Sequence, residues 1–136
     1  MNTNLYRNPK IGVRPSEVHG WGVFANSDIE AGEILEECHG LIVNPEEYKI
    51  LMRYKIKPVL CNMFSINASN YLQSFMLPYG FGCMYNSSLE SSVIADFDSG
   101  RKLMIFKSIR DVTEGSELFI NYEDTRLEMK LRGINL

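Results

Sequence analysis

The sequence lacks any long apolar run, and this absence excludes one class of protein at the outset. No stretch of about 18 or more apolar residues occurs, so we expect no transmembrane helix. Residues 1–10 contain no apolar core of the kind that a signal peptide needs. The sequence therefore predicts a protein that is not secreted.

Cysteine and histidine are too scarce for the common metal and disulfide frameworks. The three cysteines, Cys38, Cys61 and Cys83, are odd in number, widely spaced and free of any C-x-x-C pair. The two histidines, His19 and His39, have no evident carboxylate partner in the sequence. We expect no metal site, no disulfide and a reducing compartment.

Positive charge is also in short supply. Lysine and arginine number 14 against 17 acidic residues, a formal net charge of −3. This balance argues against direct binding of nucleic acid, which requires a basic surface, and is compatible with a basic partner such as a lysine-rich tail. The G-x-S-x-G, H-E-x-x-H and Walker signatures are absent as well, as are paired carboxylates.

What remains is a chain of ordinary globular composition. Its 136 residues, of which 45% are hydrophobic, suffice for one domain with a buried core. Alternating or continuous apolar patterns between turn signals predict mostly β structure. Strands are expected at residues 11–14, 21–25, 34–38, 41–43, 93–97, 103–106 and 118–122.

Helices are expected in two places only. Pro45 suits the first turn of a helix over residues 45–54, and acidic residues follow it at the positive end of that helix. Thr125 can cap a short helix that runs through Lys130. Residues 56–79 give no clear pattern, although 71–77 could form a strand.

Three segments carry residues that could serve chemistry. Gly20 and Gly22 flank an aromatic residue at the start of a strand, where backbone amides can approach a ligand without Cβ interference. Asn86 follows an apolar run and offers an amide, and Tyr122 ends the last predicted strand. Taken singly, each is more often a turn, a loop or a packing residue, and Trp21 alone is more often packing than a ligand platform.

Together and in this order, the three segments resemble the SET-domain protein lysine methyltransferases. The run GWGVFANSDIEAGEILEE is similar to the family's first motif, GFGCMYNSS to its Asn-His-Ser motif, and SIRDVTEGSELFINY to the Glu-Leu-x-x-x-Tyr run that supplies its catalytic tyrosine. The resemblance covers about residues 10–124 and looks closest to the small viral SET proteins, which share Gly-Phe-Gly and Glu-Glu-Cys at the same places.

The resemblance implies a single SET domain over residues 1–136, with its core at about 10–124. The implied fold is mostly β, with several small curved sheets and a knot-like C-terminal crossing. A short helical segment would be inserted at about 44–77, and a C-terminal helix at about 125–133 would cover the cofactor. A homodimer is compatible with so small a domain, and the localisation expected is cytoplasmic or host-nuclear.

The implied function is S-adenosyl-L-methionine-dependent methylation of a lysine in a basic extended peptide, with a histone tail as one candidate. Tyr122 would be catalytic. The implied cofactor-binding residues are His19, Gly20, Trp21, Gly22, Tyr85, Asn86, Ser87 and Leu127. The implied lysine channel contains Cys38, Ala95 and Phe119.

The sequence departs from the family pattern at several positions. Ser87 replaces the motif histidine, and serines at 91 and 92 replace the following Pro-Asn. Cys38 and Ala95 stand where relatives place channel tyrosines, which predicts a wider channel and transfer of more than one methyl group. An inactive SET-like module that binds a protein partner therefore stays open as the alternative, and a generic all-β structural domain is the third.

Overall fold

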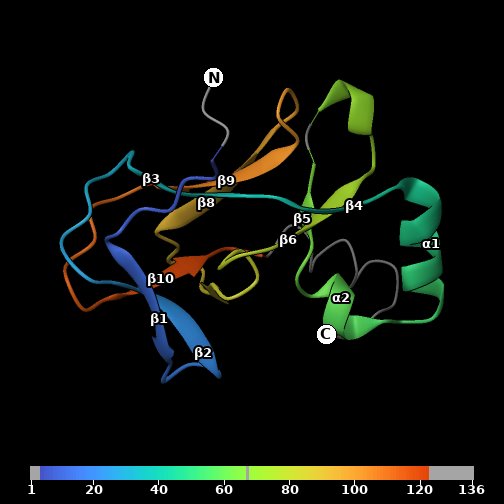
Figure 1. Cartoon of the computed structure of the whole chain (residues 1–136). Coiled ribbons are helices and arrows are strands. Elements are labelled where there is room, and N and C mark those ends of the chain that lie inside the picture. The colour runs from blue at the N-terminus through green and yellow to red at the C-terminus, as the bar shows by residue number, and fades with distance from the viewer. Residues whose placement is uncertain (1–3, 67, 123–136) are drawn as a thin grey trace.

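Short strands dominate the computed structural model, which describes residues 4–66 and 68–122 (Figure 1). The strands of the described residues are β1 (Ile11–Pro15), β2 (Trp21–Ala25), β3 (Ile34–Cys38), β4 (Gly40–Val43), β5 (Phe64–Ser65), β6 (Phe75–Pro78), β7 (Asn86–Ser87), β8 (Val93–Asp98), β9 (Leu103–Ser108) and β10 (Glu117–Ile120). Two α-helices, α1 (Pro45–Arg53) and α2 (Lys57–Leu60), and one 3₁₀ turn (Ser69–Tyr71) accompany them. The expectation of a mostly β fold is confirmed.

The larger sheet brings the two ends of the described chain together. Its strands lie in the order β1-β2-β10-β8-β9-β3, and β7 also pairs with β10. Strand β10 is antiparallel to β2 and parallel to both β7 and β8. The last strand is thus inserted between the first part of the chain and its middle, and the three motif segments become neighbours in space.

The smaller sheet has the order β4-β6-β5, with α1 and α2 beside it (Figure 1). Helix α1 begins with a capping box, because the Asn44 side chain accepts from the Glu47 backbone while the Glu47 carboxylate accepts from the Asn44 backbone. Its Tyr48 ring stacks on Phe75 of β6 at a centroid distance of 4.3 Å. The insert expected at 44–77 is therefore helical in its first half and contains β5 and most of β6 in its second.

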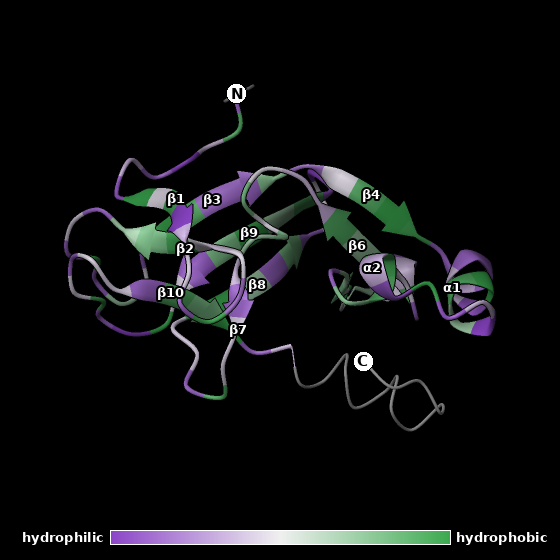
Figure 2. Ribbon diagram, turned by 90° about the horizontal axis from the view of Figure 1, so that it is seen from below, coloured by the Kyte–Doolittle hydropathy of each residue, from purple (hydrophilic) through white to green (hydrophobic). Residues whose placement is uncertain are grey.

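The main core consists of apolar side chains from nearly every strand of both sheets. Val23, Leu35, Met104, Phe106 and Leu118 are among its fully buried members. Figure 2 shows the hydrophobic colouring concentrated on β4, β6 and β9, where the larger and smaller sheets approach one another. None of the described helices is long and apolar enough to cross a membrane.

Two expectations at the C-terminal end have different outcomes. The strand predicted over 118–122 is present but shorter, since β10 ends at Ile120 and Tyr122 follows it by two residues. The helix predicted at about 125–133 lies outside the described residues, and so does Leu127.

Candidate functional site

One carboxylate joins the three motif segments. Glu117 of β10 accepts a hydrogen bond of 2.7 Å from the side-chain amide of Asn86 in β7. Its other carboxylate oxygen accepts a hydrogen bond of 2.6 Å from the Ser16 hydroxyl, which lies in the loop before β2. A side chain that accepts at both oxygens fixes the loop and both strands relative to one another.

The Asn86 amide also holds the glycine loop. Its nitrogen lies 3.1 Å from the carbonyl oxygen of His19 and 3.4 Å from that of Trp21, and it donates to both. Protein acceptors therefore engage the NH₂ group of Asn86, and the side chain orders the loop that was expected to bind cofactor.

Glycine is needed at the two positions of this loop for different physical reasons. Gly20 has a φ of +48°, and a Cβ there would meet no atom within 4 Å, so its backbone faces open space. Gly22 has no such space, because a Cβ there would overlap the Glu117 carboxylate. The first glycine keeps the backbone accessible, and the second allows β2 to approach β10.

A cleft of about 610 Å³ opens beside this loop. Six of the eight residues predicted to bind cofactor line it: His19, Gly20, Trp21, Tyr85, Asn86 and Ser87. Gly22 is not among the lining residues. The Trp21 side chain is 58% exposed, whereas Tyr85 is 3% exposed and its ring is directed into the core.

The cleft also has walls that sequence reasoning missed, formed by Val18, Cys61, Asn62, Cys83 and Met84. The Cys83 thiol donates to the carbonyl oxygen of Pro78 at 3.1 Å. Burial raises the pKa of this thiol to about 11, so it is neutral at ordinary pH. Among the described residues, no group of three His, Cys, Asp or Glu side chains could hold a metal ion.

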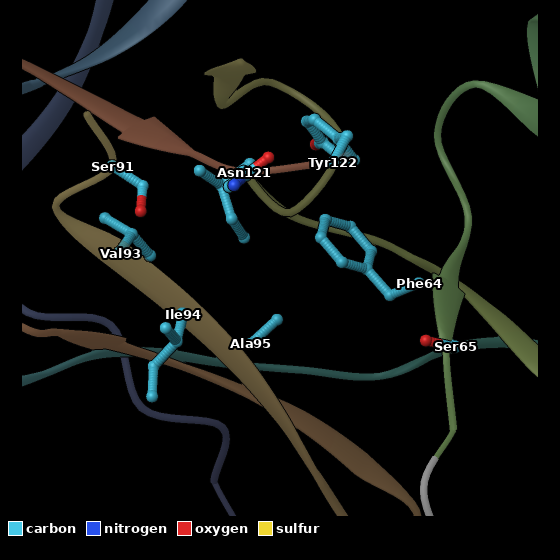
Figure 3. A pocket seen from close by; sticks show the side chains of 9 residues that line it. Phe64, Ser65, Ser91, Val93, Ile94, Ala95, Asn121 and Tyr122 are labelled. Atoms are coloured by element: carbon cyan, nitrogen blue, oxygen red, sulfur yellow. The ribbon is translucent and has the colours of Figure 1, made fainter. Parts of the chain in front are cut away.

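A second, smaller pocket of about 210 Å³ lies beside Tyr122 (Figure 3). Phe64 from β5 and Ala95 from β8 point toward one another across it. Its other lining residues are Ser65, Ser91, Val93, Ile94, Ile120, Asn121 and Tyr122. The lining is mixed: Phe64, Val93 and Ala95 offer apolar surface to a chain of methylene groups, and polar groups such as those of Ser65, Ser91 and Asn121 line the same pocket.

Only one of the three predicted channel residues, Ala95, lines this pocket. Cys38 is 2% exposed and lies beside Glu36, where burial and the neighbouring carboxylate raise the pKa of its thiol far above the usual range. Phe119 pairs with Asn86 in the β10–β7 register and lines neither cavity. Their roles in a channel stay predictions, and Phe64 is a lining residue of this pocket that the sequence analysis did not predict.

Tyr122 lines both cavities, and no other described residue does so. Its hydroxyl donates to the backbone carbonyl oxygen of Tyr85 at 3.3 Å, and its ring packs on Phe64 at a centroid distance of 5.1 Å. The Tyr122 backbone N–H lies 3.5 Å from the Ser87 hydroxyl oxygen, which accepts from it. Tyr122 is therefore held by contacts to its hydroxyl, its ring and its backbone, and it lines both the larger and the smaller cavity.

The serine departures make contacts with β10. Ser92 exchanges hydrogen bonds with Phe119, since its backbone N–H donates to the Phe119 carbonyl at 2.9 Å and its hydroxyl accepts from the Phe119 N–H at 3.2 Å. Together with the contact from Ser87, this bond connects the loop before β8 to the strand that leads to Tyr122. Ser87 and Ser92 thus both contact the segment that contains Tyr122.

Comparison with known proteins agrees with this geometry. The family model described as the SET domain matches residues 20–123. The chain belongs to the SET domain family. The match includes the glycine loop, Asn86 and Tyr122, the residues that meet around the larger cleft.

Curated relatives of this SET domain are histone-lysine methyltransferases by name. The trithorax protein of Drosophila virilis is 30% identical over 117 residues, which are 83% of this chain and 3% of that protein. The "Histone-lysine N-methyltransferase, H3 lysine-37 specific" of Schizosaccharomyces pombe is 27% identical over 124 residues, covering 91% of this chain and 80% of its own length. The chain thus spans only a small part of the first relative and most of the second.

Solved structures share the fold of this SET domain. A Plasmodium falciparum protein, titled as a histone methyltransferase candidate, superposes with a TM-score of 0.61 at 22% identity, over 85% of this chain and 94% of that one. A humanized mutant of the Chaetomium thermophilum Polycomb Repressive Complex 2 gives a TM-score of 0.62 at 21% identity, over 88% of this chain and 15% of that one.

Proposed function

We propose that the protein is a protein-lysine N-methyltransferase that uses S-adenosyl-L-methionine. The observation that carries the proposal is that Tyr122 lines two cavities, one beside the glycine loop and one that also contains Phe64, Val93 and Ala95. A methyl donor in the first and a lysine side chain in the second would meet at this phenol. The names of the curated relatives support the same activity.

The larger cleft fits a nucleoside-sized cofactor. Its volume of about 610 Å³ is within the usual range for small-molecule sites. The open backbone at Gly20 offers amide and carbonyl groups, and the exposed Trp21 ring offers an apolar surface at the rim. His19, Gly20, Trp21, Asn86 and Ser87 would hold the cofactor, which supplies a methyl group bonded to a positively charged sulfur.

The smaller pocket would prepare the lysine amine for attack. A free lysine has a pKa near ~10.4 and is almost entirely protonated at neutral pH, a form that cannot act as a nucleophile. The apolar surroundings provided by Phe64, Val93 and Ala95 disfavour the charged form and lower that pKa. The lysine ammonium would first lose a proton to solvent, and the neutral amine nitrogen would then bond to the methyl carbon as the methyl–sulfur bond breaks and the sulfur leaves as a neutral thioether.

Tyr122 would align the two reactants. Its hydroxyl is fixed by the Tyr85 carbonyl and the ring by Phe64, so the phenol oxygen has little freedom to move. A fixed oxygen can accept CH···O contacts from a methyl group and a hydrogen bond from the amine, which favours in-line geometry. Tyr122 would thus speed methyl transfer by orienting the reactants, and this role requires no proton transfer from the phenol.

We propose a basic extended peptide as the substrate, with a histone-tail lysine as the first candidate. The net charge of −3 favours a basic partner, and an extended peptide can add to a sheet edge as a further strand. A homodimer and a cytoplasmic or host-nuclear location belong to the same proposal. Light scattering of the purified protein measures the first, and imaging of the tagged protein measures the second.

The test combines cofactor binding with methyl transfer. Calorimetry should detect binding of S-adenosyl-L-methionine, and labelled cofactor should transfer its methyl group to a histone lysine found by mass spectrometry. Tyr122→Phe should lower the transfer rate by at least about a hundredfold while cofactor affinity stays within about threefold. Tyr79→Phe, a change at a 49% exposed tyrosine outside both cavities, is the matched control. Absence of cofactor binding at millimolar concentration would refute the proposal.

A further inference from the structure

A buried carboxylate that lines neither cavity lies behind the Tyr122 site. Glu36 of β3 is 1% exposed, although a buried carboxylate without partners costs several kcal/mol. Its Oε1 lies 3.4 Å from the Tyr85 hydroxyl, and its Oε2 lies 3.4 Å from both the Arg7 Nε and the Phe81 backbone nitrogen. All three groups are donors, so each carboxylate oxygen has at least one donor nearby.

The Gly-Phe-Gly segment, residues 80–82, is shaped around this carboxylate. Gly80 has a φ of +69°, and a Cβ there would come within 3.1 Å of both the Glu36 Oε2 and the Arg7 guanidinium. The Arg7 guanidinium lies 3.8 Å above the centre of the Phe81 ring, in cation–π geometry. A motif whose purpose the sequence did not reveal thus encloses the Arg7–Glu36 ion pair.

Tyr85 connects this ion pair to the site. Its ring stacks on Phe106 at 5.0 Å with an interplanar angle of 13°, and its hydroxyl meets Glu36. The backbone carbonyl of the same residue accepts the hydrogen bond from the Tyr122 hydroxyl. One residue therefore contacts Glu36 with its side chain and Tyr122 with its backbone.

The charge states of the cluster favour this arrangement. The titratable groups that face Glu36 are Arg7, Cys38 and Tyr85. Burial, and then the charge of Glu36, raise the pKa of the Tyr85 phenol well above its usual value, so the phenol keeps its proton and donates. Burial likewise keeps the Cys38 thiol neutral.

We propose that Glu36, paired with Arg7, is a positioning residue for methyl transfer, because it fixes Tyr85, whose carbonyl in turn orients the Tyr122 hydroxyl. This inference rests on the proposed methyltransferase function. Glu36 touches neither cavity, so its loss affects the alignment of bound reactants and leaves their binding unchanged.

The decisive variants are Tyr85→Phe, which keeps the stacked ring and removes only the hydroxyl, and Glu36→Gln. Each should lower kcat by about tenfold, since small misplacements of an orienting group are costly, while the peptide KM and the cofactor Kd stay within about twofold. The double variant should be no slower than the slower single variant, because both changes break the same contact. Glu37→Gln is the control, since this neighbour on β3 pairs with Arg101 and should keep the wild-type kcat.

Arginine 7 provides a second measurement on the half-exposed side of the pair. Arg7→Lys should keep most of the wild-type kcat, and Arg7→Gln should lower kcat by about as much as Glu36→Gln does. A folded Tyr85→Phe protein with kcat within twofold of wild type would overturn the inference, even if Glu36→Gln fails to fold. A wild-type protein that methylates no lysine would refute the proposed function instead, so the two failures are distinguishable.

Discussion

The side-chain amide of Asn86 and the carboxylate of Glu117 form a hydrogen bond of 2.7 Å that joins segments 31 residues apart in the sequence. Ser16 donates to the same carboxylate from the N-terminal part of the chain. The loop before β2, strand β7 and strand β10 therefore share one acceptor. Such charge-assisted contacts order the cleft before any ligand arrives, which reduces the entropy lost on binding.

Removal of the Glu117 carboxylate should disorder the cleft. Glu117→Ala leaves the Asn86 amide and the Ser16 hydroxyl without this acceptor, and we expect a loss of about 1–3 kcal/mol in unfolding free energy. Affinity for S-adenosyl-L-methionine should fall by about tenfold or more as the glycine loop loosens. Denaturant unfolding and calorimetry measure the two effects. Glu114→Ala, at an exposed turn before β10, is the control, and equal behaviour of the two variants would contradict the role of Glu117.

A methyl group at Gly22 should separate β2 from β10. Gly22→Ala places a Cβ against the Glu117 carboxylate, so the carboxylate or the strand has to shift. We expect destabilisation of about 1–3 kcal/mol and weaker cofactor binding. Thermal unfolding and calorimetry check both. Gly100→Ala is the control, because its Cβ would meet its nearest neighbour at an ordinary 3.4 Å, and it should change neither stability nor cofactor affinity. If Gly22→Ala also changed neither, the close approach of β2 to β10 would not require glycine at this position.

Local signals predicted much of the fold. Pro45 and the acidic residues after it indicated α1, and the structure adds the Asn44–Glu47 capping box as the physical reason for its start. The elements missed were α2, β5, β7 and the 3₁₀ turn at Ser69–Tyr71. Helix α2 has no side-chain cap, and β7 has only two residues that are held by pairing with β10. Such elements depend on distant partners, which local pattern does not show.

The site was predictable to the extent that a motif marked it. Gly20, Asn86 and Tyr122 lie around one cleft, as the family resemblance implied. Phe64 and Glu36 were missed for different reasons. Phe64 lies in a segment without clear periodicity, and Glu36 is an acidic residue in a strand, where a sequence gives no sign that three donors will surround it.

The space beside Ala95 should set the number of methyl groups transferred. Ala95 and Phe64 line the pocket of about 210 Å³ next to Tyr122, and a small side chain at 95 leaves room for a methylated amine. We expect di- or trimethyl product from the wild type and mainly monomethyl product from Ala95→Tyr, because the added ring fills the pocket. Mass spectrometry of the product distinguishes them. Ala31→Tyr, at an exposed turn, should keep the wild-type pattern, and monomethyl product from the wild type would contradict the expectation.

The buried Glu36 should give the free energy of unfolding a recognisable pH dependence. Burial raises its pKa above the usual 4.5, although the Phe81 N–H and Arg7 oppose this shift. Below pH 4.5 the carboxyl is neutral in both states, and as the pH rises through the raised value the folded protein has to ionise a buried group. The wild-type protein should therefore lose stability relative to Glu36→Gln over that window, measured by thermal unfolding at a series of pH values.

Glu33 should give a pH dependence of the opposite sign. The backbone N–H of Glu30 and then Lys10 lower the pKa of its carboxyl group. The free energy of unfolding of the wild-type protein should therefore rise relative to that of Glu33→Gln as the pH rises toward 4.5. If the stability of wild type and of Glu36→Gln changed with pH in the same way, ionisation of the buried Glu36 would not destabilise the folded protein, and the prediction for Glu36 would be wrong.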